Sequence, residues 1–352
     1  RLSYTTSTKL YLEDRRNNVA WYSTLPFPVH VVDKVETLDH ISETSYSQRY
    51  RYRHGAFCPV EREFRGFALS EQWDTETLGV DPNDPESPEV RPPVFTKTWV
   101  HTGLYRGGKS LEQALVEEYY LSSSMPLLPD TLVDDELGAT IPPEERRQAV
   151  RALRGRPLRQ EVYADDGSDK ALIPYTTTET SYRARRKQAS QTVAGKELPA
   201  VFDVIPDQSL TVHLERNPTD PRLAHSLTLE VDEYGATTLA AEVVYPRQSP
   251  LPNVPGQDEQ VIVISETEVE HDDARTDGIY RLGVPIAAKT WELAGVPAVA
   301  AGTLLTPDTL RAHWATSAAH EISYEVAPSS GEQRRLLQAE ETRYLDAALQ
   351  NE

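Results

Sequence analysis

The sequence predicts a mainly β fold, a long, curved and largely antiparallel sheet of hairpins that carries a helical insertion. Side chains alternate in character along Tyr46–Arg53, and the same period of two returns along Leu158–Tyr182 and His225–Arg247. Because successive side chains of a strand point to opposite faces, that period indicates strands whose two faces differ. Convincing helical spacing is confined to residues 109–155.

Residues 46–76 are predicted to form the central hairpin. His54-Gly55 predicts a turn, Pro59 predicts an end to strand pairing, and a bulge at Gly66 would let Phe67, Leu69 and Trp73 share a face. One face of the first strand should therefore be an aromatic wall and the other a row of guanidinium groups. Like charges two residues apart repel, so we expect this row to pair with acidic side chains of adjacent strands. The two faces carry Tyr46, Gln48, Tyr50 and Tyr52 on one side and Ser47, Arg49, Arg51 and Arg53 on the other.

Before this hairpin, short β-like runs are expected at Lys9–Leu12 and Val29–Val35. After it, Ser110 and Gln113 predict a capping box, and Leu111, Leu115 and Tyr119 recur at helical spacing. A second helix should begin at Pro143, with Glu144 and Glu145 near the positive end of its dipole, and should stop at Gly155. Two helices between β regions predict an inserted helical hairpin.

Strands should follow again beyond residue 158. The hairpin on either side of Asp232–Gly235 is the clearest, because Asp and Gly favour tight turns. The tail, residues 332–348, is rich in Leu, Glu, Gln and Ala, which favour a helix. The further strands are expected at Leu158–Tyr163, Tyr175–Tyr182, Leu227–Val231, Leu239–Tyr245, Val261–Ile264 and Ala287–Leu293.

Composition excludes several classes of protein. The net charge of -19 opposes binding to nucleic acid, and no apolar run approaches the roughly 18 residues of a membrane span. The single cysteine, Cys58, forms no internal disulfide, so it does not indicate a redox compartment. Arg1–Tyr4 has neither an initiating methionine nor a signal region, so we expect a piece of a longer polypeptide.

Catalytic candidates cluster on the central hairpin. A carboxylate pair could hydrolyse glycosides, but Glu61, Glu63, Asp74 and Glu76 lie among arginines, which favours structural ion pairs. Cys58 with His54 could form a thiol nucleophile, yet Pro59 follows and no orienting Asn or Asp is evident. We therefore expect no catalytic residue.

Metal and cofactor motifs are also weak. Asp81, Asp84 and Glu86 are donors suited to calcium, but their loop is broken by prolines and lacks the glycine of an EF-hand. Gly107-Gly108-Lys109-Ser110 has the end of a phosphate loop without its first glycine. No two histidines have the spacing of a zinc site, so we expect neither a metal nor a cofactor. The histidines considered are His54, His101, His213, His225, His271, His313 and His320.

Several blocks resemble, in order, the middle-to-C-terminal region of the B component of bacterial insecticidal toxin complexes, which is related to Rhs/YD-repeat and SpvB-like shell proteins. The resemblance departs at Cys58, where an acidic residue is more usual, and at Arg53, where histidine is common. The blocks that carry it are Leu25–His30, His54-Gly55, Glu61–Phe67, Glu71–Glu76, Thr96–Trp99, His101–Gly103, Leu158–Tyr163, Glu215-Arg216, Asp220–Arg222, His225 and Leu229–Asp232.

The resemblance implies a secreted structural protein, part of the wall of a hollow β-sheet shell. With a C-type Rhs subunit, such a shell encloses a toxic polypeptide and delivers it through a pore-forming A component, which binds an upstream propeller. It also implies YD-like hairpins, β-sheet wall at 1–108 and 158–352, a helical insertion at 109–157 and a strand near Leu336–Tyr344. A wall one sheet thick would have two solvated faces, in keeping with 38% hydrophobic residues. The alternative is a carbohydrate-binding or glycan-processing domain that uses the Tyr46–Glu76 hairpin.

Overall fold

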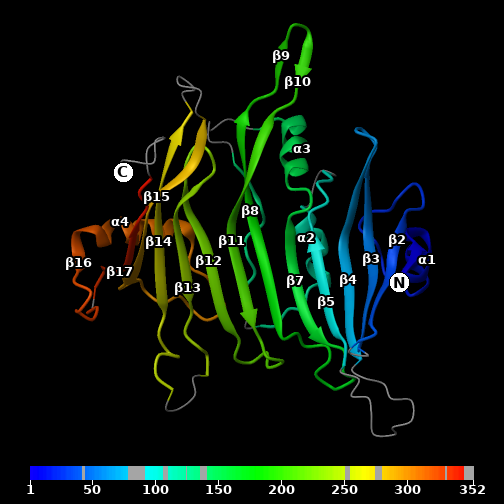
Figure 1. The fold of residues 1–352 in the computed structure, drawn as a ribbon, viewed down its shortest axis with the longest axis horizontal. Coiled ribbons are helices and arrows are strands. Elements are labelled where there is room, and N and C mark those ends of the chain that lie inside the picture. Colours follow the sequence, from blue (N-terminus) through cyan, green and yellow to red (C-terminus); the bar gives the residue numbers. More distant parts are fainter. Residues whose placement is uncertain are drawn as a thin grey trace. The chain divides into compact units, whose positions relative to one another are not determined.

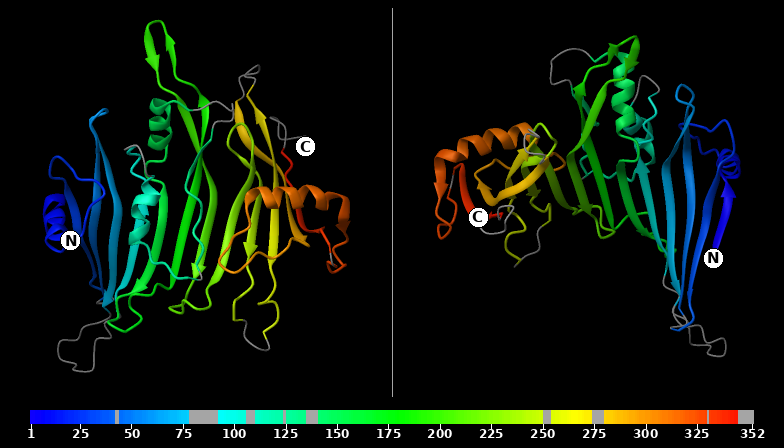
Figure 2. Two further views of the ribbon diagram at one scale, coloured as in Figure 1. Left: turned by 180° about the vertical axis from the view of Figure 1, so that it is seen from behind. Right: turned by 45° about the horizontal axis from the view of Figure 1, so that its top comes forward.

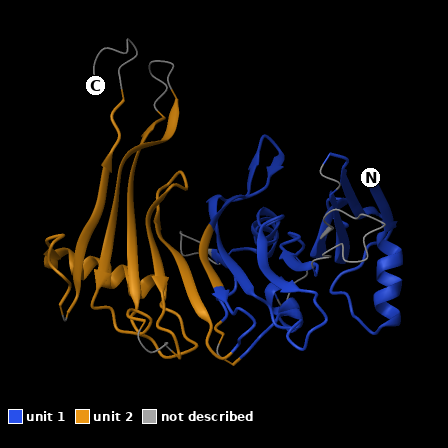
Figure 3. Cartoon of the chain, turned by 60° about the horizontal axis from the view of Figure 1, so that its bottom comes forward, with its two compact units in different colours: residues 1–122, 127–205, 212–218 blue, residues 123–126, 206–211, 219–352 orange. Residues whose placement is uncertain are grey.

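The computed structural model is mainly β, with a large mixed sheet and few helices (Figure 1). It describes residues 1–41, 44–77, 92–105, 110–123, 125–134, 141–249, 254–273, 280–329 and 331–344. The chain divides into two compact units (Figure 3). Unit 1 comprises residues 1–122, 127–205 and 212–218, and unit 2 comprises residues 123–126, 206–211 and 219–352.

The sheet of unit 1 has the strand order β1-β2-β3-β4-β5-β7-β8, and each of these neighbouring pairs is antiparallel. The short β6 pairs in parallel with β8, and β9 and β10 form a separate two-stranded hairpin. The strands are β1 (Leu2–Thr6), β2 (His30–Asp39), β3 (Thr44–Cys58), β4 (Glu63–Thr77), β5 (Val94–Val100), β6 (Leu132–Asp134), β7 (Pro157–Ala164), β8 (Thr176–Gln188), β9 (Gln191–Val193) and β10 (Lys196–Leu198). Strand β11 (Val201–His213) has residues in both units.

Unit 1 contains the helices α1 (Ser7–Arg16), α2 (Leu111–Leu115) and α3 (Pro143–Ala152), with a 3₁₀ turn η1 (Val116–Glu118) after α2. As the sequence predicts, α2 and α3 lie between β5 and β7; β6 separates them, so no short turn joins them. The hydroxyl of Ser110 caps α2 by accepting a bond from the Gln113 N–H at 3.1 Å. The side chain of Gln113 bonds to Asp130 instead of returning to Ser110, so only half of the predicted capping box forms.

The sheet of unit 2 has the order β12-β13-β14-β15-β17-β16, antiparallel except for the parallel pair β16 and β17. Helix α4 (Pro307–Ser317) lies across one face of these strands and is followed by a 3₁₀ turn η2 (Ala318–His320) (Figure 2). The strands are β12 (Arg222–Val231), β13 (Thr237–Val244), β14 (Val261–Asp272), β15 (Arg281–Ala294), β16 (Glu321–Ile322) and β17 (Gln333–Glu341).

Each unit buries one face of its sheet. In unit 1, Leu69, Trp99 and Leu158 pack with Leu115 of α2. In unit 2, alternate residues of β12 and β13 are buried on the face that α4 covers, and Leu310 of α4 is fully buried. The expectation of two solvated faces is therefore wrong for these strands, because each unit carries helical segments that shield one side from water. None of the helices that the structure describes is long and apolar enough to cross a bilayer.

The structure corrects three local predictions. Residues 9–12 belong to helix α1 and not to a strand, because Thr6 caps the helix through a bond from the Lys9 N–H. Helix α4 lies outside the region predicted to be helical. The chain does not turn at His54-Gly55: β3 continues to Cys58, and the turn follows at Pro59.

Other predictions are confirmed. The hairpin around Asp232–Gly235 joins β12 to β13, and the tail forms strand β17 as the resemblance implied, against its helix-favouring composition. Strand pairing explains why the tail is extended, because β17 forms a long antiparallel ladder with β15.

Candidate functional site

The hairpin β3–β4 is the centre of the candidate site, and its register assigns each side chain to a face. Arg49 lies opposite Trp73, Arg51 opposite Glu71, and Arg53 opposite Leu69. His54 has a positive φ of 57°, but the register stays the same on either side of it, with Gly55 opposite Phe67. The register shifts instead between the pairs Ala56–Gly66 and Phe57–Phe64, where the sequence predicts a bulge. Leu69 and Trp73 therefore share the guanidinium side, as the sequence predicts, whereas Phe67 contacts Tyr52 on the other side.

The aromatic side chains form two separate runs. On the tyrosine side, Tyr50 stacks with Tyr52 at 6.4 Å between ring centroids, and Tyr52 contacts Phe67 at 5.3 Å. On the guanidinium side, Trp73 stacks on Phe95 at 4.5 Å, and Phe95 contacts Tyr163 at 5.6 Å. The three rings of this second run come from the neighbouring strands β4, β5 and β7, so their contacts link these strands.

The guanidinium row is neutralised mainly from helix α1. Arg51 bonds to Asp14 at 2.5 Å and to Glu13 at 3.3 Å, and Arg53 bonds to Asp14 at 3.0 Å. Only Arg53 also pairs with the neighbouring strand, through Glu71 at 3.4 Å. The prediction of acidic partners is thus confirmed for Arg51 and Arg53, although most of those partners lie on a helix.

Arg49 behaves differently. Its guanidinium carbon lies 4.8 Å from the centroid of the Trp73 ring, a cation–π contact, and it has no ion pair among the residues that the structure describes. The prediction of a carboxylate partner is wrong for Arg49, because the cross-strand position holds an indole.

Asp14 is the central acceptor of the row. Burial alone would raise the pKa of its carboxyl, but the hydrogen bond from the Trp21 indole and the bonds and charges of Arg51 and Arg53 outweigh burial and lower that pKa. The carboxylate is therefore ionised and fixes α1 on β3.

A second charge network is buried on the same side of the sheet, on β7 and β8. The carboxylate of Glu161, whose residue is 0% exposed, accepts bonds from Arg159 Nε at 2.8 Å, the Tyr163 hydroxyl at 2.6 Å and the Tyr120 N–H at 2.8 Å. Arg159 also bonds to Glu179 at 2.9 Å. Burial raises the pKa of Glu179 to about 7, even though Arg159 opposes that rise.

Residues 110–122, which we call the cover segment, cross this network. His54 Nδ1 accepts the Tyr22 N–H at 2.9 Å, so its Nε2 carries the proton and lies 2.9 Å from a Glu118 oxygen. Trp99 Nε1 donates to the other Glu118 oxygen at 3.1 Å, and Arg159 lies over the Tyr119 ring at 4.8 Å. Buried polar contacts therefore hold the cover segment on the sheet, and both nitrogens of His54 are used for structure.

On the tyrosine side, the carboxylate of Asp74 accepts hydrogen bonds from three neutral side chains. It accepts bonds from the Tyr46 hydroxyl at 3.0 Å, Gln48 Nε2 at 2.9 Å and Gln72 Nε2 at 2.9 Å. Three side chains of its own face thereby hold the carboxylate in place. This arrangement fixes the register of β3 and β4.

The remaining hairpin carboxylates bind arginines, as the sequence predicts. Glu61 pairs with Arg65 and with Arg151 at 3.5 Å, and Glu63 pairs with Arg65 at 3.1 Å and with Arg154. Cys58 is a buried free thiol. The side chain of Glu76 lies outside the described residues, as do Asp81, Asp84, Glu86 and Gly107–Lys109.

The histidines lie in separate places. His101 approaches Glu112, His225 bonds to Tyr245 and Gln208, His271 bonds to Asp232, and His313 bonds to Glu332. Within the described part of the chain, no three side chains of His, Cys, Asp or Glu are placed to hold a metal ion.

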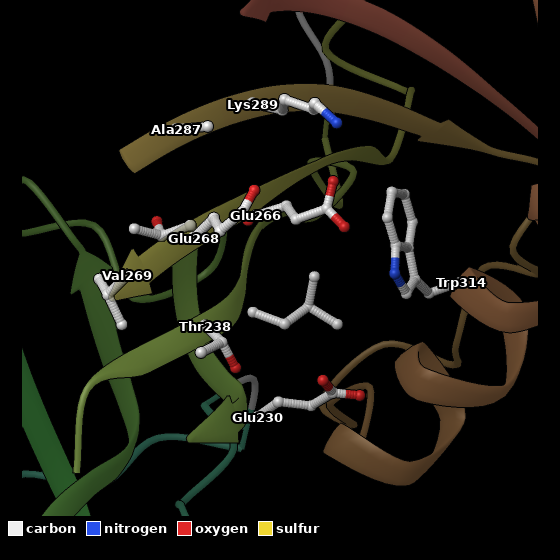
Figure 4. Close-up of a pocket in the computed structure, with 10 residues that line it drawn as sticks. Glu230, Thr238, Glu266, Glu268, Val269, Ala287, Lys289 and Trp314 are labelled. Atoms are coloured by element: carbon white, nitrogen blue, oxygen red, sulfur yellow. The ribbon is translucent and has the colours of Figure 1, made fainter. Parts of the chain in front are cut away.

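Unit 2 has an open pocket of about 360 Å³ beside α4 (Figure 4). Glu230, Glu266, Glu268, Lys289 and Trp314 line it. Lys289 lies directly opposite Glu266 across β14 and β15, and Glu266 also accepts a bond from Trp291 Nε1 at 3.3 Å. The pocket is therefore an open, polar end of the sheet face.

Comparisons with known proteins agree with this architecture. The family model for the insecticide toxin TcdB middle/N-terminal region matches residues 1–103, and the model for the TcdB middle/C-terminal region matches residues 148–277. Together the two models cover about two thirds of the chain. The comparison with curated protein sequences gives no match.

Solved structures give the same relationship. The crystal structure of TcdB2-TccC3 is 28% identical with a TM-score of 0.72, covering 86% of this chain and 15% of that chain. The Photorhabdus luminescens Tc holotoxin pore is 28% identical with a TM-score of 0.73, covering 98% of this chain and 16% of that chain. TcdB2-TccC3 without the hypervariable C-terminal region is 27% identical with a TM-score of 0.74, with the same coverage.

The chain thus spans about a sixth of the length of the solved chains that it matches. The two TcdB models match residues 1–103 and 148–277, and the structural likeness extends over nearly all of the chain. The chain therefore belongs to the TcdB family of insecticide toxins, and its match is to the middle region.

Proposed function

We propose that the chain is part of the wall of a toxin-complex shell, which encloses a polypeptide cargo together with a C-type Rhs subunit. The observation that carries the proposal is the likeness to TcdB2-TccC3 over 86% of this chain. The association of the assembled shell with a pore-forming A component is proposed from the likeness to the Tc holotoxin pore. We also propose that the protein acts after secretion.

The physical character of the strands supports a wall. Both units hold long antiparallel ladders, and unit 1 fixes its ladder with buried ion pairs such as Arg159–Glu161 at 2.8 Å. Buried and fully hydrogen-bonded charges stabilise one register over its alternatives, because a shift of one strand by one residue would leave each buried charge without its partner. A wall that must keep its shape around a cargo needs that fixed register.

Catalysis is not part of the proposal. The carboxylates Glu61 and Glu63 bind arginines, Asp74 binds three neutral donors, and His54 uses both nitrogens. The glycan-processing alternative is not favoured for the same reason, and the similar solved structures are toxin complexes. The division into wall at 1–108 and 158–352 with a helical insertion at 109–157 stays a prediction.

Assembly tests the proposal directly. The polypeptide that carries this chain should be co-expressed with a C-type Rhs subunit, purified, and imaged by electron microscopy. We expect a hollow particle in which these residues form wall. Two folded proteins that do not associate, or an associated particle without an internal cavity, would refute the shell function.

Activity is tested by replacing His54, Cys58, Glu61, Glu63 and Asp74 singly. Losses of toxicity should follow losses of folding or assembly. A variant that assembles and releases cargo normally, yet loses a measurable turnover, would show that the wall is also an enzyme.

A further inference from the structure

Helix α3 and the turn that follows it carry three arginines along one side (Figure 1). Arg147, Arg151 and Arg154 follow one another at intervals of four and three residues. The Arg154 N–H donates to the Arg151 carbonyl at 3.1 Å, so the helical spacing continues past the end of α3. Side chains at these intervals are neighbours on a helix surface, and like charges among them destabilise the helix. The arrangement therefore favours an anion beside it.

A fourth guanidinium group reaches these arginines from strand β4. Arg65 Nη1 donates to the Gly103 carbonyl at 3.2 Å, and a Cβ at Gly103 would lie 3.0 Å from Arg154 Cβ. Burial lowers the pKa of Arg65, Cys58 opposes this effect, and the charges of the three arginines of α3 and its turn lower the pKa further. The four groups therefore act on one another electrostatically. We call Arg65, Arg147, Arg151 and Arg154 the arginine cluster.

Among the described residues, three carboxylates pair with the arginine cluster. Glu61 and Glu63 come from the β3–β4 hairpin and bind the cluster from the side of the sheet. The third, Glu144, lies 3.3 Å from Arg147, but its side chain is 84% exposed, and exposed ion pairs contribute little. The cluster therefore carries more positive charge than the carboxylates around it neutralise.

The outer part of the arginine cluster is open to a partner. The side chains of Arg151 and Arg154 are 48% and 41% exposed, and that of Arg147 is 26% exposed, whereas that of Arg65 is 2% exposed. Arg151 contacts Glu61 through Nη1 alone, at 3.5 Å. Because a guanidinium group has five N–H donors, Arg151 keeps donors for a further acceptor on its exposed side.

The chemistry of these donors selects carboxylates that are linked to one another. The planar guanidinium fork matches the two oxygens of a carboxylate, and the cluster already binds Glu61 and Glu63 in this way. One free carboxylate gains little from an exposed arginine. Several carboxylates on one segment can engage neighbouring arginines together, because the first contact makes the others intramolecular.

We propose that the arginine cluster is a docking surface for an acidic polypeptide segment of another protein, whose carboxylates pair with Arg147, Arg151 and Arg154. The net charge of -19 makes the field of the whole chain repel such a segment, so attraction is confined to this part of the surface. The inference does not depend on the shell function, because it rests on charges within unit 1.

The test is a titration of the polypeptide that carries this chain into a hexaglutamate peptide bearing a neutral dye, followed by fluorescence anisotropy at low ionic strength. A hexaglutamine peptide with the same dye is the matched probe. Hexaglutamate should bind at least about tenfold more tightly than hexaglutamine, the effect of three exposed ion pairs. Arg147→Gln and Arg151→Gln should each weaken hexaglutamate binding about two- to fivefold and leave hexaglutamine unchanged.

The matched control is Arg16→Gln. Arg16 is an exposed arginine in the last turn of α1, as Arg151 is in the last turn of α3, so both variants lose the same charge from the same kind of position. Arg16→Gln should leave the affinity for hexaglutamate unchanged. Near-ultraviolet circular dichroism confirms that each variant is folded.

Three results would overturn the docking surface: equal affinity for the two peptides, equal losses in Arg16→Gln and Arg151→Gln, or no binding of hexaglutamate at low ionic strength. A thymidine oligonucleotide of the same length tests the chemistry of the partner. If it binds more tightly than hexaglutamate, the partner is a phosphate polymer and the assignment to an acidic polypeptide is wrong.

Discussion

Nδ1 of His225 lies 2.9 Å from the hydroxyl oxygen of Tyr245 in the core of unit 2. The same hydroxyl accepts the Leu305 N–H at 2.9 Å, so it donates its proton to the imidazole. His225 Nε2 is therefore protonated and bonds to Gln208 Oε1 at 3.1 Å. This buried chain of bonds needs a neutral histidine, because a doubly protonated ring would place two donors against each other.

We expect unit 2 to lose stability in acid through His225. Burial lowers the pKa of His225 to about 4, from 6.5 in the unfolded chain. Between those values the unfolded state binds more protons, so this contribution is complete above pH 6.5 and is lost as the pH falls towards 4. The difference corresponds to at most about 3 kcal/mol. Urea unfolding at several pH values should show this loss of stability in the wild type and not in His225→Phe. Parallel pH profiles of the free energy of unfolding for the two proteins would contradict this prediction.

Glu179 should make the stability of unit 1 depend on pH in the opposite direction. Its carboxyl pKa is raised by burial to about 7, from 4.5 in the unfolded chain. The folded state therefore binds more protons between those values, and this contribution to stability declines as the pH rises from 4.5 to 7. Glu179→Gln should remove that decline, and its stability relative to the wild type should be greater at pH 8 than at pH 5. A constant difference across that range would be evidence against the assignment.

Asp14 should be the most sensitive acidic residue of helix α1. Its side chain is 2% exposed and receives Arg51, Arg53 and the Trp21 indole. Asp14→Asn leaves two half-buried guanidinium groups without their shared charge and should cost about 3–5 kcal/mol. The control is Asp308→Asn on α4, whose exposed pair with Arg311 should be worth less than about 1 kcal/mol. Similar denaturation midpoints for the two variants would refute the role given to Asp14.

Two glycines of unit 2 allow the cost of a strained backbone to be measured apart from the cost of a steric clash. Gly295 and Gly302 have similar positive φ values, 82° and 79°. A Cβ at Gly295 would overlap the backbone of Gly331 and lie 2.6 Å from Glu332 N, whereas a Cβ at Gly302 would meet open space. Gly302→Ala should cost about 1–2 kcal/mol, the penalty for a left-handed residue. Gly295→Ala should cost clearly more in thermal unfolding, and equal costs would show that the 331–332 backbone moves aside freely.

The strands could be predicted from the sequence, whereas most of the helices and side chains that cover the sheets could not. Alternation along Tyr46–Tyr52 and Leu227–Val231 predicts strands, because each has one apolar or aromatic face. Helix α4 also has a local signal, Thr306 as cap followed by Pro307 and Asp308, so sequence reasoning could have found it.

Other features depend on partners distant in the sequence. Asp14 is buried because Arg51 and Arg53, 37 and 39 residues away, bond to it. His54-Gly55 has the composition of a turn, yet the strand continues through both residues because Tyr22 and Glu118 contact the two ring nitrogens of His54.

The most direct test of the shell function is protection of the cargo from a protease. A complex of the polypeptide that carries this chain with a C-type Rhs subunit bearing a protease-sensitive cargo should be treated with protease, and the intact cargo followed over time. The proposal predicts that the enclosed cargo survives at protease concentrations that digest the free cargo. Digestion of the cargo at the free rate, while both subunits stay intact and associated, would contradict it.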